Sequence, residues 1–276
     1  MPREILMLKT LNKIFIVSFL ICSIGIIGCS DDSVNNFSAN PQENNFTYPF
    51  AINSFWYYGT RNFVNNFRPD SLRNIFGSDT ITGYGDARFI RDTVIGFDTL
   101  RILRNNHADV GHSHATFELY KQTDSGLVRY ASYSNGNNFG PFRAGSDIKF
   151  SFNDKNYNSL NEIFNYYKYN IDNFKEIVSG DTTLILDDPP VNSLKYPVSE
   201  NLMWDFFNNN NLKITKKYLD FENINLLGTN YYCIKIQRQW YFDNSEIPDA
   251  NLISYDYFSK DGMVKRDFLI KDIAVN

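Results

Sequence analysis

The segment that decides the fold lies near the C-terminus and reads Leu252-Ile-Ser-Tyr-Asp-Tyr-Phe-Ser-Lys-Asp-Gly-Met-Val-Lys-Arg-Asp-Phe-Leu-Ile270. Two runs rich in aromatic and branched aliphatic residues, 252–259 and 263–270, flank Lys260-Asp261-Gly262. An Asp-Gly pair between two such runs is a strong local signal for a β-hairpin, because both residues accept the backbone that a tight turn needs. The segment therefore predicts a pair of antiparallel strands.

The same kind of signal recurs along the chain. Hairpins are predicted around the turns 96–98, 123–126 and 179–181, and further strands at 55–63, 148–152, 212–219 and 230–240. Helices are predicted only at 71–76 and after Ser159, where Ser159 and Glu162 form a capping box before Ile163, Phe164 and Tyr167. No alternation of strands and helices is present. The fold class is therefore mainly β, an antiparallel curved sheet forming a half-barrel or sandwich with at most one or two short helices.

Composition supports this class and excludes some functions. The chain has 24 Phe and 18 Tyr, residues that favour strands. Removing residues 1–28 takes away three basic residues and one acidic residue and leaves 24 Lys+Arg against 30 Asp+Glu. A mildly acidic chain is a poor partner for nucleic acid, whose binding needs a basic surface.

The N-terminus has the pattern of an export signal. Basic residues in 1–13 precede the uncharged apolar run 14–27, which is shorter than the roughly 20 residues of a membrane-spanning helix. Ile26-Ile27-Gly28-Cys29 then resembles the lipobox of bacterial lipoproteins. That resemblance implies cleavage before Cys29 and acylation of its thiol and its new amino group, with palmitate among the chains. The alternative is an ordinary signal peptide that contains Cys29.

The residues after Cys29 refine the predicted location. Ser30 follows the cysteine where Asp would favour retention at the inner membrane, so the resemblance implies the outer membrane, at its periplasmic or cell-surface face. Residues 30–46 are polar and rich in Asn, which is typical of a tether. We therefore expect a signal peptide at 1–28, a lipidated flexible tether at 29–46 and one β-rich domain at 47–276.

One sequence frame occurs twice. Tyr48-Pro49 and Tyr196-Pro197 are each followed, after six residues, by Trp56 and Trp204. The frame is interpreted either as an internal repeat, with related halves 47–186 and 191–276 joined by a loop at Asp187-Asp188-Pro189-Pro190, or as chance similarity.

The frame also carries a second resemblance. Tyr48-Pro49…Trp56-Tyr57-Tyr58 and the ending Gly262-Met263-Val264-Lys265 are similar to uncharacterised β-rich lipoprotein domains of bacteria. This resemblance implies an antiparallel curved sheet and no particular activity.

The three histidines fall within eight residues, His107, His112 and His114. On a strand, His112 and His114 share one face, which is a geometry for a transition metal. Together with Glu118 they resemble half of the first cupin motif, although no later His exists for its second half. His107 is a further candidate ligand, and Asp109 could also complete such a site. The alternative is a polar loop that leads into a strand.

No catalytic set emerges from the remaining sequence. Phosphate-binding glycine loops, nucleophile elbows and zinc-protease helices are missing. Cys233 is the one cysteine left beside Cys29 after processing, and we interpret it as a plain strand thiol. The sequence therefore predicts a lipid-anchored envelope protein without enzymatic activity or cofactor. Its predicted partners are the membrane, through the lipid on Cys29, and a protein or a small apolar ligand. The alternative is the metal-binding cupin-like protein.

Overall fold

The computed structural model describes residues 46–275, with gaps at 71–79, 110–111, 136–148, 158–159, 161–162, 165–166, 168–174, 180–181 and 209–210. Within this part the chain is mainly β, as predicted. The strands are β1 (Phe55–Arg68), β2 (Thr80–Ile95), β3 (Asp98–Asp109), β4 (His112–Thr123), β5 (Gly126–Asn135), β6 (Phe150–Phe152), β7 (Lys155–Tyr157), β8 (Lys175–Ser179), β9 (Thr182–Lys195), β10 (Met203–Asn208), β11 (Leu212–Leu226), β12 (Thr229–Phe242), β13 (Leu252–Ser259) and β14 (Gly262–Val275).

The strands form one sheet in the order β10-β11-β12-β13-β14-β1-β2-β3-β4-β5-β9-β8, and β6 and β7 attach to β14. Every pairing is antiparallel except that of β1 with β14. The hairpin that opened the sequence argument is confirmed, because Ser259 pairs with Gly262 across its turn. The predicted hairpins β2–β3, β4–β5 and β8–β9 are confirmed in the same way.

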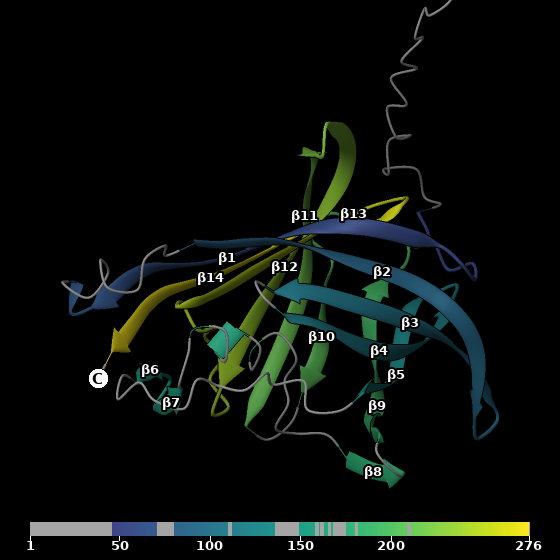
Figure 1. The fold of residues 1–276 in the computed structure, drawn as a ribbon, viewed down its shortest axis with the longest axis horizontal. Coiled ribbons are helices and arrows are strands. Elements are labelled where there is room, and N and C mark those ends of the chain that lie inside the picture. Colours follow the sequence, from purple (N-terminus) through teal and green to yellow (C-terminus); the bar gives the residue numbers. More distant parts are fainter. Residues whose placement is uncertain are drawn as a thin grey trace, which may run out of the picture. The chain divides into compact units, whose positions relative to one another are not determined.

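The sheet curves until it is nearly closed into a barrel-like shape (Figure 1). Side chains of β10 and β11 bridge the remaining seam to β9. The Trp204 indole N–H donates to the Asn192 carbonyl at 2.9 Å, and the Tyr218 hydroxyl donates to the Lys195 carbonyl at 2.7 Å. These two donors replace part of the backbone ladder that a fully closed barrel would have.

The interior contains two large hydrophobic clusters. One, which we call the upper cluster, surrounds Trp56 near the start of β1 and includes Tyr58, Phe89 and Tyr218. The lower cluster surrounds Trp240 near the end of β12 and includes residues of β6, β7 and β14. In β12 the inward positions Ile236, Arg238 and Trp240 alternate with outward ones, so one strand contributes to both clusters and to the space between them.

The two Tyr-Pro frames meet in the upper cluster. They precede β1 and β10, and both tryptophans are buried there, as expected of residues that anchor strands in the core. The Tyr48 backbone N–H donates to the Tyr196 hydroxyl at 2.9 Å.

The prediction of a loop at residues 187–190 is wrong. These residues belong to β9, which continues through them with a register shift opposite β5, where Leu186 faces Ala131 and Val191 faces Arg129. Two prolines are accepted at such a bulge because it leaves the ladder locally unpaired. The sheet therefore continues across the segment that was expected to be a loop.

The expected helix at 71–76 lies outside the described residues. Of the second, Leu160, Ile163, Phe164 and Tyr167 are described and have helical backbone. The last three are buried in the lower cluster, which agrees with their predicted helical spacing. Within the described residues, none of the helical segments has the length and apolar character that crossing a membrane requires.

Candidate functional site

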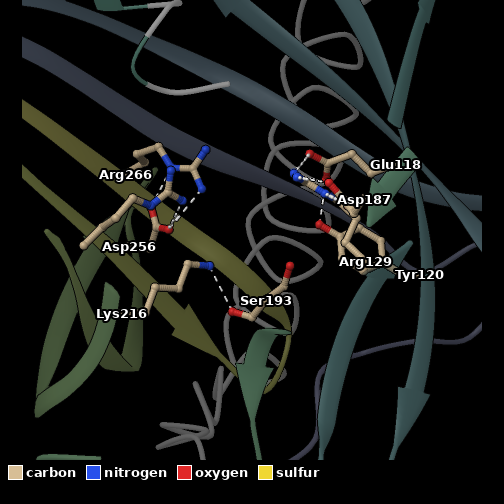
Figure 2. A network of polar contacts seen from close by, with 9 residues as sticks. Glu118, Tyr120, Arg129, Asp187, Ser193, Lys216, Asp256 and Arg266 are labelled. Carbon is tan, nitrogen blue, oxygen red and sulfur yellow. Dashed lines mark hydrogen bonds and ion pairs between the residues drawn. The ribbon is translucent and has the colours of Figure 1, made fainter. Parts of the chain in front are cut away.

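A layer of charged and polar side chains lies inside the barrel, between the upper and lower hydrophobic clusters. Figure 2 shows its polar contacts. The layer consists of Glu118, Tyr120, Arg129, Asp187, Ser193, Lys216, Arg238, Asp256 and Arg266, which we call the charged layer. Its members come from β4, β5, β9, β11, β12, β13 and β14. Strand alternation turns each of them inward at a position where an apolar residue would ordinarily sit.

One side of the charged layer is built around Arg129. Its Nε and one terminal nitrogen donate to the two oxygens of Asp187 at 2.7 and 3.0 Å, a bidentate pair. A terminal nitrogen also lies 3.8 Å from a carboxylate oxygen of Glu118, whose other oxygen accepts from the Tyr120 hydroxyl at 2.8 Å. Burial opposes the charge on Arg129, but Asp187 and Glu118 together raise its pKa above the ordinary value.

The opposite side of the layer is built around Asp256. Arg266 donates to both of its oxygens at 2.5 and 3.1 Å, and Arg238 donates to one of them at 3.3 Å. Burial favours the neutral acid, but the two guanidinium groups prevail and lower the pKa of Asp256. This side carries two cations for one carboxylate, and the Arg129 side carries one cation for two.

Lys216 lies between the two sides and is only 4% exposed. Its ammonium donates to the Ser193 carbonyl at 2.9 Å and lies 4.2 Å from the centre of the Phe206 ring. The carboxylate that attracts it, Asp256, is already bonded to two arginines. Burial lowers the pKa of Lys216 well below the ordinary value, and the neighbouring arginines lower it further.

The Phe206 ring lies close to three cations. Besides Lys216, the guanidinium carbons of Arg238 and Arg129 lie 5.2 and 5.7 Å from its centre. The negative face of an aromatic ring attracts cations at such distances, and the attraction increases where water is excluded. Phe206 therefore offsets part of the repulsion among the cations.

The charged layer borders a cavity of about 80 Å³. A water molecule needs only about 10–15 Å³ by such a measure, so this cavity has room for several waters or for an anion of several heavy atoms. Among the described residues the layer contains four cations and three carboxylates, which leaves one positive charge in excess. An uncompensated buried charge is costly, so the layer favours either a neutral Lys216 or a bound anion.

The structure places Glu118 in the charged layer, apart from the backbone of the other predicted metal ligands. The backbone of β3 and β4 pairs His107 with His114 and Asp109 with His112, so His112 and His114 lie on one strand and not in the polar loop of the alternative interpretation. Glu118 belongs to the charged layer, four residues further along β4 and thus about 13 Å from His114 at the usual rise per residue. The side chains of the other four lie outside what the structure describes, so this metal site stays a prediction.

The described residues contain no group of three or more potential His, Cys, Asp or Glu ligands placed to hold a metal ion. Cys29 also lies outside the described residues, so its lipidation stays a prediction. Cys233 is buried in β12, and burial raises the pKa of its thiol to about 12. The thiol is therefore protonated at neutral pH, as a plain strand thiol should be.

Sequence reasoning missed the charged layer. Asp187 in particular was expected to be a loop residue, but it is buried in β9 against Arg129. A signal was present in neighbouring strands, where Lys216 and Arg238 occur in phase with the inward apolar residues of the alternation. A charge in the apolar phase of two adjacent strands indicates a buried polar group.

Comparison with known proteins identifies no relative of this chain. No protein-family model, curated protein or solved structure matches the chain.

Proposed function

We propose that this protein is a lipid-anchored, non-enzymatic protein of the outer membrane that binds a small anion inside its barrel. The anchor rests on the lipobox-like sequence that ends at Cys29. The observation that carries the binding role is the set of four cationic side chains against three carboxylates around a cavity of about 80 Å³. This polar site favours an anionic ligand over the small apolar ligand expected from the sequence.

The arrangement supports binding better than it supports catalysis. The guanidinium groups of Arg129 and Arg266 are held by bidentate carboxylates, so both are fixed before a ligand arrives. Among the described residues, the Lys216 ammonium donates one hydrogen bond, to the main-chain carbonyl of Ser193. An ammonium has three donors, so it can contact an anion while it keeps this bond.

Binding is tested by titrating the mature chain from residue 29, carrying Cys29→Ser, with sodium acetate, formate and phosphate at constant ionic strength, following heat and melting temperature. A bound anion stabilises the folded state by mass action, so we expect saturable binding and a rise in melting temperature. Lys216→Met removes the excess charge and should abolish both effects. Lys213→Met changes an exposed lysine of the same strand and should preserve them. Equal responses of the two variants, or no response of the parent, contradict the binding role.

The anchor is tested separately by mass spectrometry of the protein purified from membranes. An N-terminal peptide beginning at an acylated Cys29 is expected. A mature protein with an unmodified Cys29 contradicts the anchor and leaves the anion titration interpretable.

The second candidate function is metal binding at the β3–β4 hairpin. The observation in its favour is the backbone register, which pairs His107 with His114 and Asp109 with His112. Metal analysis of the purified protein tests it, with His112→Ala and His114→Ala as variants. A metal content far below one ion per chain that neither variant changes contradicts it.

A further inference from the structure

We propose that the rim of the barrel around the start of β1 rests on the lipid surface that holds the anchor, with its exposed apolar turns in the interface. The proposal rests on the predicted acylation of Cys29 for the identity of that surface. It concerns the outside of the barrel, and it is independent of the anion site inside.

Exposed apolar side chains concentrate on this rim. The described chain has nine large apolar residues that are strongly exposed, and seven of them lie on β1, β2 and β10 or in the turns at this rim: Ile52, Phe55, Tyr57, Val94, Phe97, Met203 and Leu227. The strand directions place these residues toward one end of the sheet, because β1 and β10 begin on this side while β2 and β11 end there. The strand ends are staggered, since Met203 pairs with Lys217, ten residues before Leu227. Single exposed apolar residues are ordinary, but Phe55, Tyr57 and Leu227 line one groove together, and a contiguous apolar surface marks an interaction site.

The turn between β11 and β12 exposes an apolar side chain at a position where a polar residue or glycine is usual. Leu227 and Gly228 have φ values of 51° and 83°, so both central residues of the turn are in the left-handed region. Asn-Gly is the favoured pair for such a turn, and a leucine there carries backbone strain. Leu227 is nevertheless 70% exposed and forms one wall of an open groove of about 450 Å³. Folding alone gives no reason for an apolar side chain at this position.

The β2–β3 turn and the segment before β1 each carry one more exposed apolar side chain. Phe97 follows Gly96 at the tip of its hairpin and is fully exposed. Ile52 lies in the turn that leads into β1. Figure 1 shows the β11–β12 hairpin projecting beyond the sheet above β13. Projecting turns can place apolar side chains at the headgroup level while the strands stay in water.

The path of the chain identifies a membrane as the occupant. Phe46 and Tyr48 are buried beside Trp56 and Tyr196, so the chain enters the domain at this rim. Sixteen residues lie between Cys29 and Phe46, and the chain from one to the other can span at most about 60 Å when fully extended. The chain that leads to an acylated Cys29 leaves the domain at this rim, so this rim is the one from which the tether runs to the bilayer.

The experiment uses the mature chain from residue 29 with Cys29→Ser, which lacks the apolar segment 14–27 and carries no acyl chain, and flotation with phosphatidylcholine vesicles. The test variant is Phe97→Ser with Leu227→Asn, in which asparagine suits the left-handed turn and should preserve folding. Burial of one such side chain is worth about tenfold in partitioning or more, so we expect the ratio of bound to free protein to fall at least about tenfold. Ile247→Ser, at an exposed residue of the β12–β13 loop on the opposite rim, should leave the ratio unchanged.

A second measurement does not depend on how well the variants fold. Phe97→Cys and Ile247→Cys, each in the mature Cys29→Ser chain, are labelled with an environment-sensitive fluorophore. The labelling is selective because this chain lacks Cys22 and Cys29, and its remaining cysteine, Cys233, is buried. Vesicles should shift the emission of the label at 97 to shorter wavelength and leave the label at 247 unchanged.

Equal emission shifts at both positions, or no vesicle binding by the parent, overturn the proposal. If vesicles bind while mass spectrometry finds Cys29 unmodified, the anchor fails and the rim contact stands. If Cys29 is acylated and the Cys29→Ser chain does not bind, the rim contact alone fails.

Discussion

Two Asp–Arg pairs in this barrel have nearly the same local geometry and very different surroundings. Asp256 and Arg266 face each other directly across β13 and β14, and Asp92 and Arg101 face each other across β2 and β3. Each arginine donates from Nε and from a terminal nitrogen, at 2.5 and 3.1 Å in the first pair and 2.7 and 3.1 Å in the second. Their environments therefore decide what each pair contributes.

The inner pair lies in the charged layer, where the Asp256 side chain is 2% exposed. In the outer pair the Asp92 side chain is 37% exposed, so water screens the attraction. Removal of one partner of a buried pair leaves the other uncompensated, whereas removal of one partner at the surface lets water replace it. The inner pair should thus be essential to folding and the outer pair nearly dispensable.

The largest effect is expected from Asp256→Asn. It leaves Arg238 and Arg266 buried without their shared carboxylate, and loss of one partner in such a site costs about 3–5 kcal/mol of unfolding free energy. Urea unfolding measures this loss. A cost below about 1 kcal/mol, which is the size expected for an exposed pair, would contradict the prediction that burial makes this pair essential to folding.

Next in size is the pH dependence that Lys216 adds. Because its folded pKa lies below the unfolded value of about 10.4, the unfolded chain binds more protons between the two values. Stability should therefore rise with pH in that window, by at most about 1.4 kcal/mol per pH unit. Urea unfolding between about pH 7 and 9.5, below the range where tyrosines titrate, should show this rise in the parent.

The control for this rise is Lys216→Met, which lacks the titrating group. The variant should be at least as stable as the parent at neutral pH and should lose the upward slope. A slope that persists in Lys216→Met would assign the effect to another group.

Asp256 gives a pH dependence of the same direction at acid pH, but here it is the ionised form that stabilises the folded state. Its folded pKa is below the unfolded value of about 3.9, so its contribution is present above that value and is lost as the pH falls below it. Acid unfolding followed by circular dichroism should therefore begin at a higher pH in Asp256→Asn, because this variant has lost the stabilising contribution at every pH.

A smaller loss is expected from Tyr120→Phe. The change keeps the ring and removes the hydroxyl that donates to Glu118 at 2.8 Å. A hydrogen bond to a charged group contributes about 1.5–3 kcal/mol, and urea unfolding should show a loss in this range. A neutral result would indicate that water replaces the hydroxyl in the cavity.

The smallest effect is expected from Asp92→Asn. The pair is exposed, and such pairs contribute about 0–1 kcal/mol. The difference from Asp256→Asn, measured under identical conditions, is the direct test of the comparison. Comparable losses in the two variants would contradict it.

Much of the fold could be predicted because its signals are local. The turns at Asp261-Gly262 and Gly96-Phe97 specify hairpins through the backbone conformations of the residues within them, and both hairpins form. The β9 bulge at residues 187–190 could not be predicted in this way. Its two prolines indicate a loop when they are considered alone, and the pairing with β5 that keeps them in the sheet involves residues about 60 positions away.

The sequence by itself determined the β class, the hairpins and the lipobox-like pattern at Cys29, because each depends on residues that are neighbours in the chain. Tertiary structure alone decided that Arg129, Lys216 and Asp256 share one cavity, because they lie on separate strands that meet only when the sheet curves. It also decided which charges are buried. The local geometry of an Asp–Arg pair is the same in water and in a core, and only the surrounding strands determine which of the two it occupies.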